Sequence, residues 1–105
     1  MTARHEKIQE ALREAAAEFL AREASRQSLV TVTRAVLRED GAHGTIFITV
    51  FPESFEAAAV EFANRHRGEF AEFFMERVRG IHMPRVEFMI DAGEKNRQRL
   101  DELSN

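Results

Sequence analysis

The sequence predicts an α+β fold in which helices pack on one face of a three-stranded sheet. Two long segments carry apolar residues at the 3.6-residue spacing of helices. Three other segments are β-branched or alternate between apolar and polar residues, as strands do. The two kinds of segment interleave in the order helix, strand, strand, helix, kink, helix, strand, and a short helix follows. Such an order favours helices that cover one face of a sheet.

The length and composition predict one domain over residues 1–105. The chain has 105 residues, of which 44% are hydrophobic and 31% charged, so it can bury a core without disulfides. It contains no cysteine, which excludes thiolate chemistry. No apolar run reaches the length of a membrane span, and the charged start lacks a signal-peptide pattern. We therefore expect a cytoplasmic protein with no membrane partner.

The first helix is predicted from a Thr2 cap to about Ala24. Its opposite face carries acids at every fourth position, and this face is expected to avoid phosphate. The apolar stripe is Ile8, Leu12, Ala15, Ala16, Phe19 and Leu20, and the acidic stripe is Glu6, Glu10, Glu14 and Glu18.

A β-hairpin is predicted over residues 29–51. Residues 29–38 are rich in β-branched side chains, and residues 40–44 have the composition of a turn. Residues 45–51 alternate, with Phe47 and Phe51 on the less buried phase. The turn also matches the GXXG loop by which KH domains clamp nucleic acid, but it joins two strands, so we interpret it as a hairpin turn only.

A kinked helix pair is predicted over residues 54–79. Pro52 ends the second strand and Ser54 is expected to cap the first of the two helices. This helix is expected to bury one stripe, formed by Phe55, Ala58, Ala59, Phe62 and Ala63.

The kink is predicted at Gly68. Helix dipoles favour cations in a last turn and anions in a first turn, by roughly 0.3–1 kcal/mol each. Cations precede Gly68 and carboxylates follow it, so the charges and the glycine mark the same break, with Gly68 at positive φ. The second helix should end at Arg77 and Arg79, with Gly80 as its C-terminal glycine. The flanking charges are Arg65, His66 and Arg67 before the break, and Glu69 and Glu72 after it.

The last strand is predicted over residues 85–91 and a terminal helix over residues 94–103, with a turn at Ala92–Gly93 between them. Alternation should place one set of side chains inward and the other outward. The inward set is Val86, Phe88 and Ile90, and the outward set is Arg85, Glu87, Met89 and Asp91.

Charge and motifs limit the function. The net charge of −3 is unlike that of a generally basic nucleic-acid binder, so an RNA contact would need a local basic surface. No histidine pair has metal-ligand spacing, and no nucleophile elbow or phosphate loop is present, so we expect no metal, no cofactor and no catalytic residue. A helix that starts beside Arg65, His66 and Arg67 would offer backbone N–H groups to phosphate.

Two long segments resemble the ribosome-binding factor A family. They are LVTVTRAVLREDGAHGTIFITVFPE, residues 29–53, and MERVRGIHMPRVEFMIDAGEK, residues 75–95. The resemblance implies a type II KH-like fold in which a kinked Ala-x-Gly replaces the GXXG loop. Residues 66–68 fall on that triplet, with histidine in place of the alanine.

The resemblance also implies a bacterial, non-enzymatic assembly factor, associated with growth in the cold. Such a protein binds free 30S subunits and 16S rRNA, and assists late maturation and 5′-end processing of that RNA. We expect a monomer that does not bind DNA. Two alternatives remain: another KH-like RNA-binding or ribosome-associated module acting during translation, and a protein-interaction domain. The residues expected to contact RNA are Arg34, Arg65, His66, Arg67, Gly68, Arg77, Arg79 and Arg85.

Overall fold

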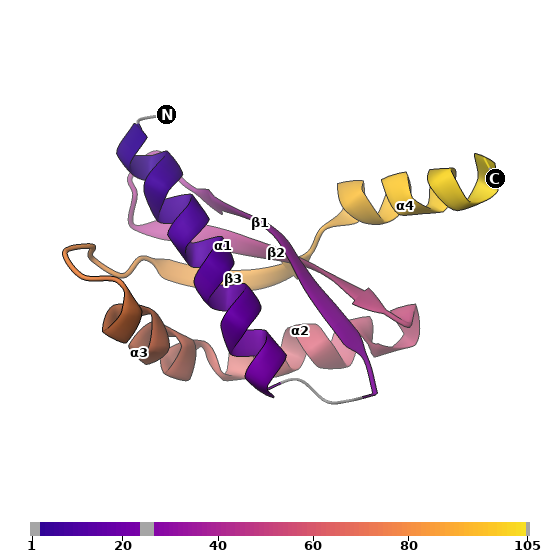
Figure 1. The fold of residues 1–105 in the computed structure, drawn as a ribbon, viewed down its shortest axis with the longest axis horizontal. Coiled ribbons are helices and arrows are strands. Elements are labelled where there is room, and N and C mark those ends of the chain that lie inside the picture. Colours follow the sequence, from indigo (N-terminus) through magenta and orange to yellow (C-terminus); the bar gives the residue numbers. More distant parts are fainter. Residues whose placement is uncertain (1–2, 24–26, 105) are drawn as a thin grey trace.

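Helices α1, α2 and α3 cover one face of a three-stranded sheet, and α4 extends away from it (Figure 1). The computed structural model describes residues 3–23 and 27–104, so the predicted limits Thr2 and Ala24 of the first helix lie outside the described residues. The α+β class and the order of elements are as predicted. The elements are α1 (Ala3–Glu23), β1 (Leu29–Leu37), β2 (His43–Phe51), the 3-10 turn η1 (Glu53–Phe55), α2 (Glu56–Arg65), α3 (Arg67–Arg77), β3 (Arg85–Ile90) and α4 (Ala92–Ser104).

The sheet is mixed, with strand order β1-β2-β3. Strands β1 and β2 form the antiparallel hairpin, in which Leu29 pairs with Phe51, and β3 runs parallel to β2. The hairpin register shifts between Val32 and Arg34, which marks a β-bulge at Thr33. A bulge twists its strand and redirects side chains. Arg34 is the first residue after this bulge.

The core lies between the sheet and the three covering helices. Aromatic rings hold the layers together: Phe70 of α3 lies 5.6 Å from Phe19 of α1 and 5.8 Å from Phe88 of β3, between ring centroids. Each fully buried apolar side chain contributes about 1.5–3 kcal/mol to folding. The least exposed large side chains are Phe70, Phe74, Phe88, Leu12, Ile46 and Ile48.

The start of α2 differs from the prediction. Ser54 does not cap a helix, because Phe55 N donates to Pro52 O and closes a 3-10 turn that includes Ser54. Helix α2 therefore begins at Glu56. Within the predicted buried stripe, Ala63 is buried as predicted, whereas Ala58 is exposed.

The end of the last strand also differs. Asp91, predicted to point outward, is only 4% exposed. Its Oδ1 accepts a hydrogen bond from Glu94 N at 3.0 Å, so it caps a helix that starts at Ala92. The predicted turn at Ala92–Gly93 is instead the first turn of α4.

Helix α3 ends at Arg77, so Arg79 does not close it and lies in the loop that follows. Gly80 has φ +80° and turns this loop. At the hairpin turn, Gly41 has φ +67° and Asp40 Oδ1 accepts a hydrogen bond from Ala42 N at 2.8 Å.

Candidate RNA interface

Helices α2 and α3 are separated by one residue, His66. Its φ of −100° and ψ of 19° leave the helical region and bend the chain. The predicted break at Gly68 is therefore wrong. Gly68 lies inside the first turn of α3, and the positive-φ residues in the described part of the chain are Gly41 and Gly80.

The histidine is held in the bend by two contacts. Its ring packs on Phe62 with centroids 4.2 Å apart, and its Nδ1 lies 3.1 Å from Glu69 Oε1. Its backbone N–H reaches both Phe62 O and Ala63 O. Ala63 on α2 and Phe70 on α3 both face the core.

The start of α3 offers backbone donors. The first amide of α3 that bonds to a carbonyl at the junction is Phe70 N, which donates to His66 O at 3.0 Å. The N–H groups of Arg67, Gly68 and Glu69 precede it in the first turn, and His66 does not cap them with its side chain. Together with the positive end of the helix dipole, such groups attract anions.

These donors lie beside a hollow of about 390 Å³. It contains two arginines from different parts of the chain, Arg67 on α3 and Arg85 at the start of β3. Arg67 Nε donates to Asn64 O at 3.0 Å, and Arg85 N donates to Ala42 O at 2.8 Å, so both backbone and side-chain contacts fix the walls. The lining residues are Arg67, Gly68, Ala71, Met83, Pro84, Arg85 and Val86.

Gly68 is one of the residues that line this hollow. A Cβ built on it would meet no atom within 4 Å, so the space beside it is empty. The glycine is thus not required by backbone conformation, and what it provides is close access to the backbone.

Asn64 is a site residue that the sequence did not indicate. Its Nδ2 donates to Phe88 O at 3.0 Å, and its Oδ1 accepts from Phe88 N at 2.8 Å. This pair of bonds joins the last turn of α2 to the free edge of β3. It fixes the bend relative to the strand that carries Arg85. An asparagine near a helix end gives no local signal of such a contact.

Two of the predicted RNA-contacting arginines lie near acidic residues outside the hollow. Arg77 pairs with Glu18 of α1 at 2.9 Å, and its guanidinium lies 4.3 Å from the centre of the Phe73 ring. Arg65 lies 3.7 Å from Glu61 on its own helix. The acidic stripe of α1 therefore draws Arg77 away from the hollow.

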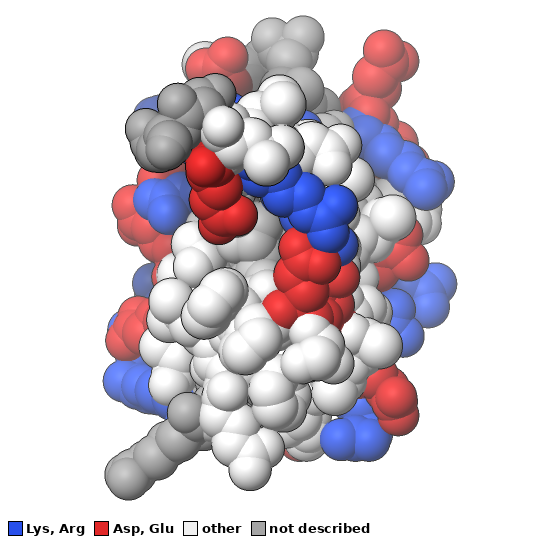
Figure 2. All heavy atoms as spheres, turned by 90° about the vertical axis from the view of Figure 1, so that its right-hand side faces the viewer, with Lys and Arg blue, Asp and Glu red and all other residues white. Residues whose placement is uncertain are grey.

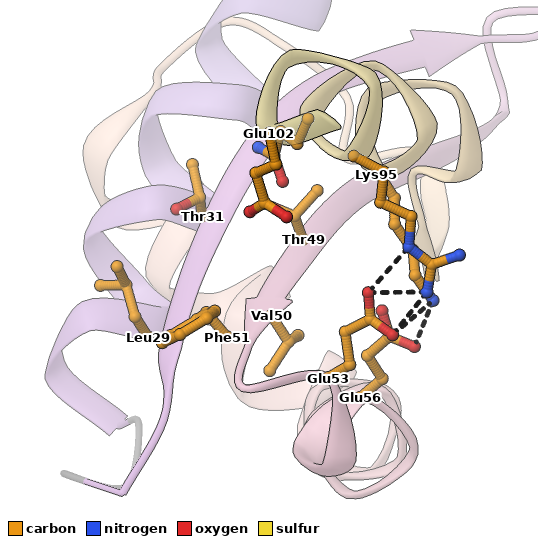
Figure 3. A pocket seen from close by; sticks show the side chains of 11 residues that line it. Leu29, Thr31, Thr49, Val50, Phe51, Glu53, Glu56, Lys95 and Glu102 are labelled. Atoms are coloured by element: carbon orange, nitrogen blue, oxygen red, sulfur yellow. Dashed lines mark hydrogen bonds and ion pairs between the residues drawn. The ribbon is translucent and has the colours of Figure 1, made fainter. Parts of the chain in front are cut away.

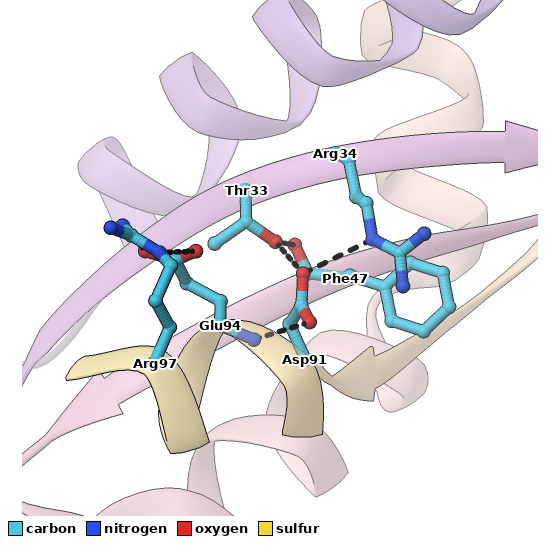
Figure 4. A network of polar contacts seen from close by, with 6 residues as sticks. All are labelled: Thr33, Arg34, Phe47, Asp91, Glu94 and Arg97. Atoms are coloured by element: carbon cyan, nitrogen blue, oxygen red, sulfur yellow. Dashed lines mark hydrogen bonds and ion pairs between the residues drawn. The ribbon is translucent and has the colours of Figure 1, made fainter. Parts of the chain in front are cut away.

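Arg34 lies on β1, outside the hollow, on the face of the sheet that α1, α2 and α3 leave open (Figure 4). Its Nε donates to Asp91 Oδ2 at 3.1 Å, and its guanidinium lies 4.1 Å from the centre of the Phe47 ring. Burial alone would raise the pKa of Asp91. Hydrogen bonds from Thr33, Glu94 N–H and Arg34, with the charge of Arg34, hold that pKa below its usual value. The structure thus brings Arg67, Gly68 and Arg85 together, and places Arg34 elsewhere.

A second hollow, of about 250 Å³, lies between α4 and the end of the hairpin (Figure 3). Leu29 and Phe51 form its apolar side, and they are 67% and 71% exposed. Glu53 accepts hydrogen bonds from Arg99 on the other side. The end of the molecule that carries α4 shows acids and bases around an uncharged area, without a large patch of one sign (Figure 2). Its charges are balanced, so it is a poorer phosphate surface than the first hollow.

None of the described helices has the length and hydropathy needed to span a membrane. Within the same residues, histidines and carboxylates do not gather into a group of three that could hold a metal.

Comparisons with known proteins point to one family. The family model for ribosome-binding factor A matches residues 4–104. The crystal structure of ribosome-binding factor A from Thermus thermophilus is similar with a TM-score of 0.71 and 25% identity, covering 82% of this chain and 94% of that chain. No curated protein sequence matches the chain.

Two further structures are similar. One is a homology model of Thermus thermophilus ribosome binding factor A fitted into a cryo-EM map of a 30S–RbfA complex. It has a TM-score of 0.65 and 28% identity, covering 75% of this chain and 86% of that chain. The other is a Thermotoga maritima protein described as a putative ribosome binding factor A and solved by solution NMR, with a TM-score of 0.58 and 23% identity over 81% of this chain and 80% of that one. The last likeness supports the fold alone.

Proposed function

The chain belongs to the ribosome-binding factor A family, and we propose that it is a non-enzymatic factor that binds free 30S subunits through 16S rRNA. In this proposal it assists late 30S maturation, including processing of the 5′ end of 16S rRNA. The family resemblance of residues 29–53 and 75–95 is confirmed by the match over residues 4–104.

A similar protein supports the choice of partner. The Thermus thermophilus ribosome binding factor A, 28% identical to this chain, was fitted into a map of a 30S complex. The shared fold covers most of both chains, so a related surface is available here.

The observation that carries the proposal is the hollow at the start of α3. It combines N–H groups of a first helical turn, two arginines from separate elements, and a glycine that leaves the backbone accessible. Phosphate contacts of this kind position a protein on RNA, and the shape of the fold then selects the site. A net charge of −3 for the whole chain limits binding to this local surface.

Cosedimentation with purified 30S subunits, 50S subunits and whole ribosomes tests the proposal. We expect retention by 30S subunits, with affinity that falls as salt rises. If two to four phosphates are neutralised, log K should fall with log salt at a slope of roughly −2 to −4. Equal retention by whole ribosomes would favour a module that acts during translation, and a slope near zero would exclude an RNA-phosphate interface.

Charge reversal locates the surface. Arg67→Glu and Arg85→Glu should each weaken 30S binding, because each removes a phosphate contact and adds a repelling charge. Arg97→Glu is the matched control, since Arg97 is an exposed helical arginine on α4 outside the hollow. Equal losses in all three variants would place the RNA interface somewhere else.

A further inference from the structure

A row of three side chains crosses the open face of the sheet, the face that α1, α2 and α3 do not cover. Arg34 of β1 pairs with Phe47 of β2, which pairs with Met89 of β3. The Arg34 side chain is 56% exposed and Met89 is 45% exposed. The row therefore combines a guanidinium, an aromatic ring and a thioether from three neighbouring strands.

The guanidinium of Arg34 is fixed in place, unlike most surface arginines. The bulge at Thr33 redirects the strand at this point, and the guanidinium lies over the Phe47 ring at 4.1 Å. Its Nε donates to Asp91, which is 4% exposed and also accepts from Thr33 Oγ1 at 2.6 Å. An arginine held in this way loses little conformational entropy when it binds a ligand.

The remaining surface of Arg34 is available. Among the described side chains, only Asp91 hydrogen-bonds to this guanidinium, and it does so through Nε, which leaves both Nη groups. One face of the planar group covers Phe47. The other face is the flat surface on which a nucleobase can stack.

Charge favours a base over a phosphate at this position. The positive charge of Arg34 is compensated by Asp91, and Glu87 lies exposed on the same face of β3, two residues from Met89. An additional anion would gain little there. A neutral, flat group would still gain stacking and apolar contact with Met89.

We propose that the row Arg34–Phe47–Met89 binds an unpaired nucleobase of single-stranded RNA, which stacks on the Arg34 guanidinium. The inference rests on the proposed function, and it adds a second contact to the phosphate site in the hollow. Arg85 lines that hollow and stands on the same face of β3 as Met89, four residues away, or about 13 Å along a strand. Arg34 lies two strands further across the sheet, or about 10 Å from Met89, so an RNA strand of a few nucleotides can place a phosphate at Arg85 and a base on Arg34.

A short single-stranded RNA that carries the fluorescent base 2-aminopurine tests the stacking. Its fluorescence should change on binding to the wild-type protein, and the Met89 methyl NMR signal should shift. Arg34→Lys keeps the charge and removes the planar group, so it should weaken binding roughly fivefold or more. Phe47→Leu, which removes the ring beneath the guanidinium, should act in the same direction.

Arg38→Lys is the matched control, since Arg38 is an exposed arginine directly after β1 and has no part in the row. It should leave the affinity within about twofold. An Arg34→Lys effect no larger than that of Arg38→Lys would overturn the inference, as would wild-type protein that leaves the fluorescence and the Met89 signal unchanged. A duplex RNA of the same sequence should not shift Met89, and an equal shift would also contradict base stacking.

The two proposals fail separately. If Arg67→Glu abolishes 30S binding while Arg34→Lys leaves the fluorescence response intact, the proposed base stacking on Arg34 is wrong and the proposed function stands. If the base stacks on Arg34 but wild-type protein is not retained by 30S subunits, the base contact is supported and the proposed function is wrong. Urea unfolding of Arg34→Lys and Phe47→Leu shows that each variant is folded under the binding conditions.

Discussion

Arg34 and Asp91 stand 57 positions apart in the chain, and Arg34 Nε donates to Asp91 Oδ2 at 3.1 Å. The two residues belong to opposite edges of the sheet, because β2 lies between β1 and β3. The same carboxylate accepts from Thr33 and caps α4. One buried side chain therefore joins β1 to the end of β3 and sets where the last helix begins.

Asp91→Ala should lower the free energy of unfolding by about 1–3 kcal/mol, since it removes a helix cap, the nearer of the two acceptors of the Thr33 hydroxyl and the acidic partner of Arg34. Urea unfolding measures this loss. Asp101→Ala is the control, because Asp101 is an exposed acid on the same helix, 3.7 Å from Arg97. Its effect should stay within about 0.5 kcal/mol, and equal losses would show that Asp91 contributes no more than a surface acid.

Stability should depend on acid pH through Asp91. The pKa of Asp91 is lower in the folded protein than in the unfolded chain, so its ionised carboxylate stabilises the fold. This stabilisation is complete at pH values above the unfolded-state pKa of about 3.9, and it is lost as the pH falls through the folded-state pKa. Asp91→Asn should therefore be less stable than wild type near neutral pH, and the difference should narrow below about pH 4. Urea unfolding over a pH series measures it. A difference that is constant with pH would contradict this linkage.

Gly68→Ala should stabilise the protein by up to about 1 kcal/mol, because Gly68 is helical and a Cβ there meets no atom within 4 Å. Gly68 lines the hollow, so an added methyl group should reduce access to its backbone, and 30S binding should weaken while stability rises. Gly80→Ala is the matched comparison. Its φ of +80° strains any other residue, so it should cost about 1 kcal/mol or more in chemical unfolding. The same sign for both glycines would refute the assignment of the bend to His66.

Phe70→Ala should cost about 3–5 kcal/mol, because the ring is fully buried and contacts rings from α1 and β3. Met75→Ala on the same helix serves as the control, since Met75 is 50% exposed. Its cost should be below about 1 kcal/mol in the same urea titration. A small effect at Phe70 would mean that α3 does not anchor the core.

Helix α4 should exchange its amide hydrogens faster than α1, because none of its described side chains is buried and ion pairs attach it to the body. Glu53 accepts hydrogen bonds from Arg99, which lower the pKa of Glu53. Glu53→Gln should speed exchange across α4 with little change in global stability, as expected for exposed pairs. Glu87→Gln, an exposed change on β3, should leave α4 unaffected. Unchanged exchange in Glu53→Gln would mean that other contacts hold the helix.

Several features could be predicted from the sequence because they depend on neighbouring residues. The period of apolar residues distinguishes helices from strands within a few turns, and it led to the α+β class and the order of elements. Turn residues such as Asp40 and Gly41 affect the backbone over two or three positions, so the hairpin could also be predicted from the sequence. The long segments around them carried the family resemblance.

Other features were decided only by tertiary structure. Charge and propensity around residues 65–72 allowed a break at Gly68, but Asn64 is bonded to β3 and the break lies at His66. Local spacing contains no information on which distant side chain will meet an arginine. The sequence therefore predicted an RNA contact for Arg77. In the structure, α1 packs on α3 and places Glu18 2.9 Å from Arg77. The alternation of side chains likewise predicted that Asp91 points outward. Its burial depends on donors from Thr33, Arg34 and α4, which come together only in the folded sheet.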